Sequence, residues 1–335
     1  MHAGQSSRRQ FLKSGLAVLG LGLSPGCATI GPWASTGTRT PRIGYLALAA
    51  LPEFLQAAFN AGLEERGYTI GKTVAVESRA ANDPPTLRQL AAELVALKCD
   101  VLVAAGAPVI APLMDATTTI PIVSPTLGDP VGMGVVASLG HPGGNITGLS
   151  LMTTELSAKR LELLKEAVPN VARVGMLLNP TNPNAELERR QTEIVGQALG
   201  LKVVPLEVRQ PEDFDAAFGV AHREQVEALL TMVDVLMYDQ RDRIVQFAAA
   251  HRLATVHYAR PAVAQGGLMA YDMVHAENYR RAATYVDRIL KGARPSDLPI
   301  ERPTKFELVI NMKTAESLGL SIPQTVLAQT TELIQ

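Results

Sequence analysis

The sequence predicts an α/β protein of two lobes, each a doubly wound parallel sheet, joined by a hinge. Strand-like and helix-like segments alternate along the chain, which is typical of parallel sheets covered by helices on both faces. The order of segments in residues 42–124 recurs in residues 173–257, which indicates a duplicated α/β half rather than a short solenoid repeat. A late helix and strand then predict a chain that crosses between the lobes more than once.

The first half begins with the apolar strand-like run Arg-Ile-Gly-Tyr-Leu at residues 42–46. Short apolar runs predict strands at residues 43–46, 74–77, 101–104 and 121–123, and helical periodicity predicts helices at 54–66, 87–97 and 109–116. Gly67 follows the first of these helices, where glycine is a favoured C-cap.

The second half repeats this order, starting from Arg-Val-Gly-Met-Leu at residues 173–177. Strands are predicted at residues 173–177, 203–207, 228–230, 255–257, 267–271 and 306–310, and helices at 185–199 and 277–290. We expect residues 41–148 with 275–302 to form lobe 1, and residues 149–274 with 303–335 to form lobe 2.

The first 27 residues are typical of an export signal. Ser-Arg-Arg-Gln-Phe-Leu-Lys at residues 7–13 is followed by an uncharged run too short to span a bilayer of about 30 Å, which is the twin-arginine pattern. The segment ends in Leu-Ser-Pro-Gly-Cys, which resembles a lipobox and makes Cys27 a candidate for acylation. The alternative is a soluble periplasmic protein cleaved at a nearby small residue. Residues 28–40, rich in Gly, Pro, Ser and Thr, predict a flexible linker.

Composition limits the classes of function. Hydrophobic residues make up 47% of the 335 residues, enough for a large core, and the formal net charge of −1 does not favour a nucleic-acid partner. After Gly26 no apolar run is long enough to cross a membrane. The second cysteine, Cys99, precedes a strand-like run and is predicted to be a buried small hydrophobe.

The motifs of enzymes are missing from the sequence. The six histidines show no His-Glu-x-x-His spacing, and neither a Gly-x-Ser-x-Gly elbow nor a phosphate-binding Gly-x-x-x-x-Gly-Lys loop occurs. The glycines at 132 and 134 formally match a dinucleotide fingerprint, but they come late in the first half rather than after its first strand. We therefore expect a protein that is not an enzyme, without a metal or cofactor.

Candidate ligand contacts lie where predicted parallel strands end, because ligands of open α/β sheets bind at that edge. The candidates are Ala47, Gly106, Ala107, Thr126 and Asp129 in the first half and Thr181, Asn182, Asp234 and Tyr271 in the second. Several have an alternative structural role. Asp234 either pairs with a ligand ammonium or caps the next helix, Asp129 is either a contact or a turn residue, and Tyr271 either stacks on a ligand or packs in the hinge. The turn containing Asn182 either holds a carboxylate or only caps a helix.

Five segments carry a family resemblance. They are Gly-Asp-Pro-Val-Gly at 128–132, His-Pro-Gly-Gly-Asn-Ile-Thr-Gly-Leu-Ser at 141–150, Lys-Arg-Leu-Glu-Leu-Leu-Lys-Glu at 159–166, Asn-Pro-x-Asn-Pro at 179–183 and Pro-Thr-Lys-Phe-Glu-Leu-Val-Ile-Asn at 303–311. Together they resemble the substrate-binding proteins of ABC transporters, a family that includes tryptophan- and tyrosine-binding members. The resemblance runs from Arg42 onward.

The resemblance implies a type I periplasmic-binding-protein fold with three crossovers and a small solute held between the lobes. It implies delivery of that solute to an ABC permease and its ATPase. We accordingly expect a periplasmic monomer that contacts the membrane only through a lipid anchor. The alternatives are a periplasmic ligand-sensing module and, less favoured, a two-lobed α/β enzyme.

Several positions depart from the family pattern. Ala47, Ala49 and Ala107 stand where relatives usually carry Ser or Thr, and Val235 replaces the usual Pro after Asp234. The strand before the late helix reads Met-Ala-Tyr-Asp in place of Met-Ser-Tyr-Gly. With these hydroxyls missing, an amino acid and an aromatic or apolar carboxylate both stay open as the ligand.

Overall fold

The computed structural model describes residues 39–335. The predicted leader, Cys27 and the linker up to residue 38 lie outside the described residues, so the expectations placed on them stay predictions. Within residues 39–335, none of the helices combines the length and apolar character needed to cross a membrane.

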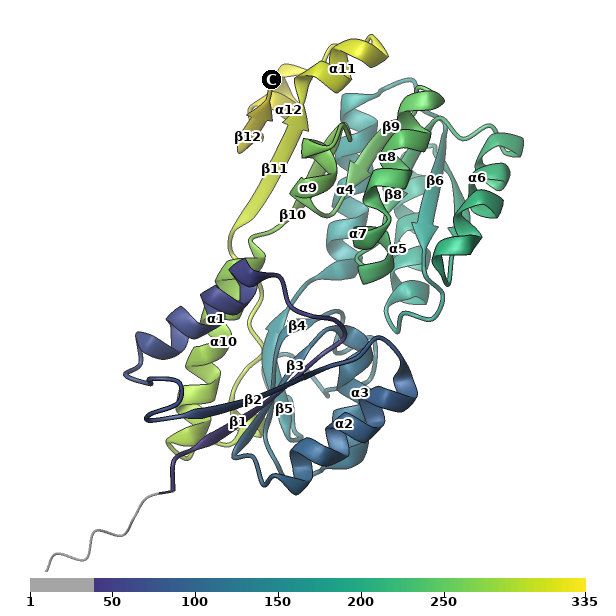
Figure 1. Ribbon diagram of the computed structural model, residues 1–335. Helices are drawn as coiled ribbons and strands as arrows, with labels where there is room; N and C mark the ends of the chain where they lie inside the picture. The colour runs from purple at the N-terminus through teal and green to yellow at the C-terminus, as the bar shows by residue number, and fades with distance from the viewer. Residues whose placement is uncertain (1–38) are drawn as a thin grey trace, which may run out of the picture. The chain divides into compact units, whose positions relative to one another are not determined.

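The first sheet is parallel and has the strand order β2-β1-β3-β4-β5. Its strands are β1 (Arg42–Ala47), β2 (Ala75–Ala80), β3 (Val101–Ala105), β4 (Ile122–Leu127) and β5 (Ile146–Ser150). Four helices cover it: α1 (Glu53–Glu64), α2 (Pro84–Ala96), α3 (Ala107–Ala116) and α10 (His275–Leu290), with α1 and α10 side by side (Figure 1). This sheet and these helices are called lobe 1.

Both faces of the first sheet are buried, as doubly wound sheets require. Ile43 and Tyr45 of β1 pack in a core with α1 and α10, whereas Leu46 packs in a second core with α2 and α3. Successive side chains of a strand point to opposite faces, so one short apolar strand supplies both cores. Cys99 is buried, as predicted.

The second sheet has the order β12-β11-β10-β9-β8-β6-β7. Its strands are β6 (Arg173–Leu178), β7 (Lys202–Glu207), β8 (Ala228–Thr231), β9 (Ala254–His257), β10 (Met269–Met273), β11 (Phe306–Asn311) and β12 (Glu332–Ile334). The α-helices packed with it are α4 (Thr153–Ala167), α5 (Ala185–Ala198), α6 (Phe214–Arg223), α7 (Val235–Asp239), α8 (Arg241–Ala250), α9 (Arg260–Ala264), α11 (Met312–Leu318) and α12 (Gln324–Leu327). This sheet and these helices are called lobe 2. Short 3₁₀ turns occupy Pro211–Asp213 and Pro295–Asp297.

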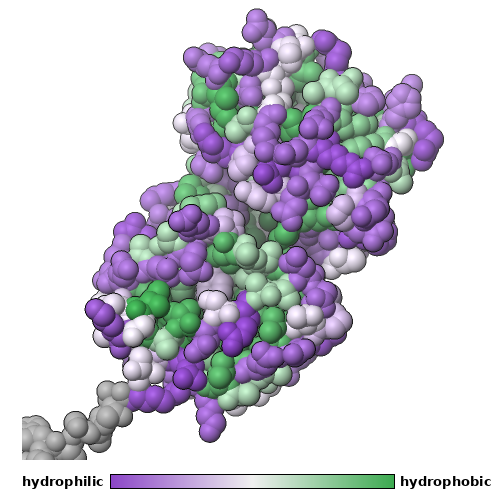
Figure 2. Space-filling model, viewed as in Figure 1, coloured by the Kyte–Doolittle hydropathy of each residue, from purple (hydrophilic) through white to green (hydrophobic). Residues whose placement is uncertain are grey.

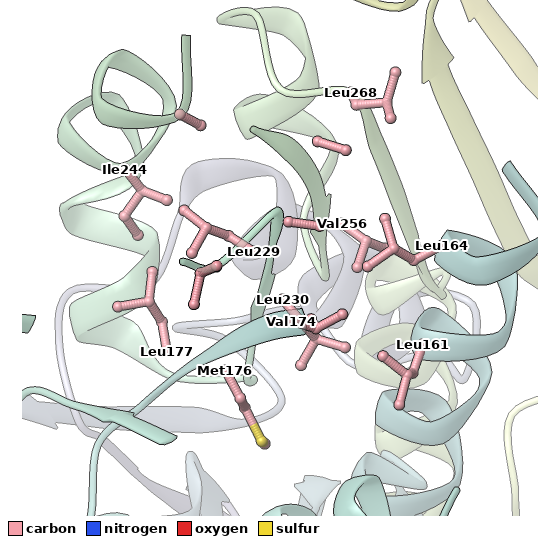
Figure 3. Packing of buried hydrophobic residues seen from close by; sticks show 14 of the residues in the cluster. Leu161, Leu164, Val174, Met176, Leu177, Leu229, Leu230, Ile244, Val256 and Leu268 are labelled. Atoms are coloured by element: carbon pink, nitrogen blue, oxygen red, sulfur yellow. The ribbon is translucent and has the colours of Figure 1, made fainter. Parts of the chain in front are cut away.

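The core of lobe 2 is one continuous cluster that joins both faces of its sheet. Figure 3 shows Leu161 and Leu164 of α4 on one side, while Leu177 and Leu229 point toward Ile244 of α8 on the other. All five side chains are fully buried. The helices thus bury apolar faces against alternating strand residues, as in lobe 1.

Every strand predicted from the sequence is present, but one direction was not foreseen. β11 runs antiparallel to β10, with Met273 opposite Phe306, whereas wholly parallel lobes were expected. The chain returns from α10 at residues 302–305 and enters β11 beside the carboxyl end of β10. β11 must therefore run in the direction opposite to β10. β5 and α4 were also missed, and β5 extends the first sheet to Ser150, two residues beyond the expected boundary at 148.

The chain passes between the sheets three times. It leaves β5 for α4 at residues 151–152, leaves β10 for α10 at Val274, and returns to β11 through residues 302–305. The carboxyl ends of the parallel strands of both sheets lead into loops beside these connections.

Candidate functional site

A cavity of about 620 Å³ lies between the two lobes. In Figure 2 hydrophobic residues border the hollow between the lobes. Lobe 1 lines the cavity with residues from the loop after β1 into α1, the start of α3, Thr126 and the start of α10, and lobe 2 lines it with residues after β6, β8 and β9 and with Glu307. The candidate residues were predicted from the strand-end rule, by which ligands of open α/β sheets bind at the carboxyl ends of the parallel strands. That rule leads to this cavity.

Six of the nine candidate residues line the cavity. They are Ala47, Gly106, Ala107 and Thr126 from lobe 1 and Asn182 and Asp234 from lobe 2. Asp129, Thr181 and Tyr271 are not among the described residues that line it.

Each of these three side chains has another partner. Asp129 accepts a hydrogen bond from the Gly132 backbone N–H at 2.9 Å, which closes a turn. The Thr181 hydroxyl donates to Asn179 Oδ1 at 2.7 Å, and the Tyr271 ring stacks on Phe306 with centroids 6.0 Å apart. These contacts match the turn and hinge-packing alternatives weighed for Asp129 and Tyr271.

Lobe 1 presents an apolar wall. The residues it contributes after β1 and at the start of α3 are Ala47, Leu48, Ala49, Ala50, Leu51, Pro52, Phe54, Leu55, Ala105, Gly106, Ala107 and Pro108, and none has a side-chain hydrogen-bonding group. Thr126 is a polar residue of this wall, and its hydroxyl oxygen already accepts from the Gly106 N–H at 2.9 Å. Gly106 has a φ of 110°, a conformation that favours glycine at this turn.

Lobe 2 presents a polar wall centred on Asp234, which is 8% exposed. Its carboxylate accepts hydrogen bonds from Asn182 Nδ2 at 2.8 Å and from the Leu236 backbone N–H at 2.8 Å. Asp234 is therefore the N-cap of α7 and also faces the cavity. The Tyr258 hydroxyl donates to the Asp234 carbonyl oxygen at 2.7 Å and supports this turn from β9. Burial raises the pKa of Asp234, partly offset by these amide hydrogen bonds.

Several lining residues were missed from the sequence. Tyr258 directly follows β9, so the strand-end rule would have found it. Tyr238, Asp239 and His275 lie within or at the start of helices that continue from strand-end loops. Glu307 lines the cavity only because β11 is antiparallel, which brings its amino end to the carboxyl end of β10.

A buried chain of polar contacts runs from the cavity into lobe 2. His275 Nε2 at the start of α10 lies 2.8 Å from Asp272 Oδ2, and Asp272 Oδ1 lies 3.2 Å from Nη2 of the fully buried Arg160. Arg160 Nε also donates to the Tyr271 carbonyl oxygen at 2.7 Å. Burial lowers the pKa of His275, but the charge and hydrogen bond of Asp272 outweigh it, so that the pKa is raised. These contacts tie α4 and β10 of lobe 2 to the first turn of α10 in lobe 1.

The chain continues to Glu188 on α5. Arg160 Nη1 donates to Ser157 Oγ at 3.2 Å, and Ser157 Oγ donates to Glu188 Oε2 at 2.7 Å. Burial raises the pKa of Glu188 to about 8, against the Ser157 hydrogen bond and the charge of Arg160. Among the described residues, no group of three or more His, Cys, Asp or Glu side chains is arranged to hold a metal ion.

Comparison with known proteins gives relatives along most of the chain. A tyrosine-binding protein of Clostridioides difficile is 25% identical over 314 residues, which covers 90% of each chain. The crystal structure of a conserved domain protein from Vibrio cholerae is 28% identical, with a TM-score of 0.82 over 88% of this chain and 100% of that one. The structure of an ABC domain in complex with L-Trp from Streptococcus pneumonia is 25% identical, with the same TM-score and coverage.

These relatives and the two-lobed architecture agree with each other. The fold is the type I periplasmic-binding-protein fold, in which two α/β lobes are connected by several crossings of the chain. The family described as ABC transporter substrate binding protein matches residues 53–334, which include every strand of both sheets except β1. The proteins of this family are substrate-binding proteins and not enzymes. This chain belongs to the family of ABC transporter substrate-binding proteins.

Proposed function

We propose that this protein is the extracytoplasmic solute-binding component of an ABC importer, which captures a small organic solute between its lobes and delivers it to a membrane permease. The observation that carries the proposal is the cavity of about 620 Å³ that both lobes line at the ends of their strands. A solute bound to one wall gains contacts with the other when the lobes close, and this differential affinity stabilises the closed form.

The lobes that move in this proposal are those expected from the sequence, residues 41–148 with 275–302 and residues 149–274 with 303–335, except that the first boundary moves to Ser150, where β5 ends. Supporting this division, the three connections between the sheets are short, and the core clusters of lobe 1 and the main cluster of lobe 2 share no buried residue. The hinge then consists of the crossings at residues 151–152, 274 and 302–305.

A thermal-shift screen followed by an uptake assay tests the proposal. Two relatives are named for tyrosine and L-Trp. The screen therefore starts with aromatic compounds that carry an amine, a carboxylate or both, and it also includes aliphatic amino acids and sugars. A true ligand at 100 times its Kd stabilises the protein by about 2.7 kcal/mol. Deleting the gene should then abolish ATP-dependent uptake of that solute. Unchanged uptake in the deletion strain would contradict the importer role, and binding without uptake would favour a sensing module.

We further propose that the leader directs export through the twin-arginine route and that Cys27 becomes acylated, which places the mature protein at a membrane in the periplasm. The support is the sequence pattern around Arg8 and Arg9 and the residues before Cys27. Replacing both arginines with Lys should leave precursor in the cytoplasm. Mass spectrometry of the membrane fraction should find a diacylglyceryl group at Cys27, and a soluble mature form that starts elsewhere would refute acylation.

A further inference from the structure

The two walls of the cavity differ in chemistry, and this difference restricts the solute. The lobe 1 wall after β1 and at the start of α3 consists of Ala, Leu, Pro, Phe and Gly residues. The lobe 2 wall carries three acids, Asp234, Asp239 and Glu307, together with Asn182. A solute that satisfies both walls has an apolar body for lobe 1 and a hydrogen-bond donor, favourably a cation, for lobe 2.

Asp234 is a buried acid, and it forms no ion pair with any cationic side chain of residues 39–335. Its hydrogen-bond partners are the amides of Asn182, Asn179 and Leu236, and the charged group that acts on it most is another acid, Asp239. Buried carboxylates are usually paired with a cation, because amide donors only partly replace the water that is lost. The cavity is the side from which Asp234 can receive a cation, since Asp234 lines it.

The cationic side chains on the cavity wall already have acidic partners. Among the described lining residues these are Arg260, whose Nε donates to Glu332 Oε2 at 2.7 Å, and His275, held by Asp272 at 2.8 Å. The first turn of α10 also stands beside the acids Asp272 and Glu307, which lie opposite each other on β10 and β11. These acids oppose the attraction of the helix N-terminus for an anion. A solute carboxylate would therefore meet no unpaired cationic side chain among the described residues that line the cavity.

We infer that the solute is an organic amine, a primary ammonium on an apolar or aromatic body without a carboxylate. This inference rests on the proposed function and narrows its substrate class. The ammonium lies against the Asp234 carboxylate with the Asn182 amide beside it, and the apolar body packs on the lobe 1 wall. Tyrosine and tryptophan carry both an ammonium and a carboxylate, so the inference separates this chain from the solutes after which its relatives are named.

Calorimetry on the purified protein, with three indole probes that differ only in their charged groups, tests the inference. Tryptamine carries the ammonium alone, L-tryptophan carries both groups, and indole-3-propionate carries the carboxylate alone; tyramine and L-tyrosine repeat the first comparison with a smaller ring. We expect each amine to bind at least tenfold more tightly than its amino acid, and the acid not to bind.

The variant Asp234→Asn tests the placement of the ammonium. Asn is an equally good N-cap, so α7 keeps its cap while the charge is removed. We expect its affinity for tryptamine to fall at least tenfold. The control is Asp213→Asn, because Asp213 also accepts backbone hydrogen bonds, from Arg209 N–H at 2.8 Å, but does not line the cavity. It should leave the affinity unchanged.

The outcomes separate this inference from the proposed function. An amino acid or the acid that binds as tightly as the matching amine overturns the inference, as does unchanged tryptamine affinity in Asp234→Asn. If no amine binds but a sugar or another solute stabilises the protein, the inference fails while the solute-binding role stands. If no compound of the whole screen stabilises the protein, both fail.

Discussion

Arg160 is fully buried and joins three segments that are far apart in the sequence. It contacts Ser157 on its own helix, Asp272 on β10 and, through Ser157, Glu188 on α5. A buried charge pair contributes little net stability when complete, but removal of one partner leaves a costly unpaired charge. We therefore expect the pair of Arg160 and Asp272 to affect the free energy of unfolding mainly when one partner is removed.

Arg160→Met should destabilise the protein by about 3 kcal/mol or more, because Asp272 stays buried without its guanidinium partner. Urea unfolding followed by circular dichroism measures this loss. The control is Lys159→Ala on the same helix, whose side chain is partly exposed and lies 3.3 Å from Glu162. Such surface pairs are worth about 0–1 kcal/mol. Equal losses in the two variants would show that the buried pair has no special role.

Glu188 should make the stability of the protein depend on pH. Its folded-state pKa of about 8 lies above the value of about 4.3 expected in the unfolded chain, so between these values the folded state keeps a proton that the unfolded state releases. The contribution of Glu188 to the free energy of unfolding is then fully present below about pH 4.3. It is lost as the pH rises toward 8, by at most about 1.4 kcal/mol per pH unit.

Glu188→Gln should remove this contribution, because the amide stays neutral at every pH. As the pH rises from 5 to 8, the free energy of unfolding of the variant should increase relative to that of the wild type. Urea titrations at several pH values measure this difference. The comparison with the wild type cancels the titration of other groups, including His257, whose pKa burial lowers to about 4. Parallel curves would mean that Glu188 is already ionised in the folded protein.

At the scale of elements, β4 and β5 approach closely at one glycine. Gly148 has a φ of 143°, and a Cβ there would lie 2.0 Å from the Ser124 carbonyl oxygen. Only glycine combines this backbone conformation with this contact. The hydroxyl and glycine content of β5, Ile-Thr-Gly-Leu-Ser, also explains why the strand was not predicted from apolar periodicity.

Gly148→Ala should therefore destabilise lobe 1 by clearly more than the cost of a left-handed alanine, which is about 1–2 kcal/mol. Gly200→Ala measures that cost alone, since Gly200 has a φ of 69° and nothing lies within 4 Å of its added Cβ. Urea midpoints of the two variants decide the comparison. If both lose the same stability, the strands can separate at no cost and the close approach is unimportant.

At the scale of the whole molecule, closure of the cavity should bury apolar side chains that are now exposed. Phe54 on α1 is 58% exposed and Val235 on α7 is 37% exposed, and they line the cavity from opposite lobes. Exposed large hydrophobic residues at a cavity often mark contacts that form on binding.

Phe54→Ala should weaken binding of the solute found in the thermal-shift screen by about tenfold or more, since burial of an aromatic side chain is worth about 1.5–3 kcal/mol. Stability without ligand should change little, because the ring is exposed in this form. Ile194→Ala is the matched control, as Ile194 is 57% exposed but lies on α5 away from the cavity. Calorimetry and unfolding separate the two effects. Wild-type affinity in Phe54→Ala would show that closure does not bury this ring.

The sequence by itself determined the two-lobed architecture and several of the residues that line the cavity. Apolar runs and helical spacing are local properties, so they predicted every strand except β5 and β12, and the repeated order of the two halves. Ala47, Ala107, Asn182 and Asp234, which were expected where parallel strands end, line the cavity, because the carboxyl ends of parallel strands lie at the same end of a sheet.

Only the tertiary structure decided the features that depend on pairing between distant segments. The antiparallel direction of β11 brings Glu307 into the cavity, and the packing of α4 on β10 pairs Arg160 with Asp272, 112 positions apart. Asp129 and Tyr271 follow the strand-end rule, yet turn closure and ring stacking keep both out of the cavity lining. Local patterns carry the period of each element, whereas the partner of each side chain depends on how those elements pack, and packing is a property of the whole folded chain.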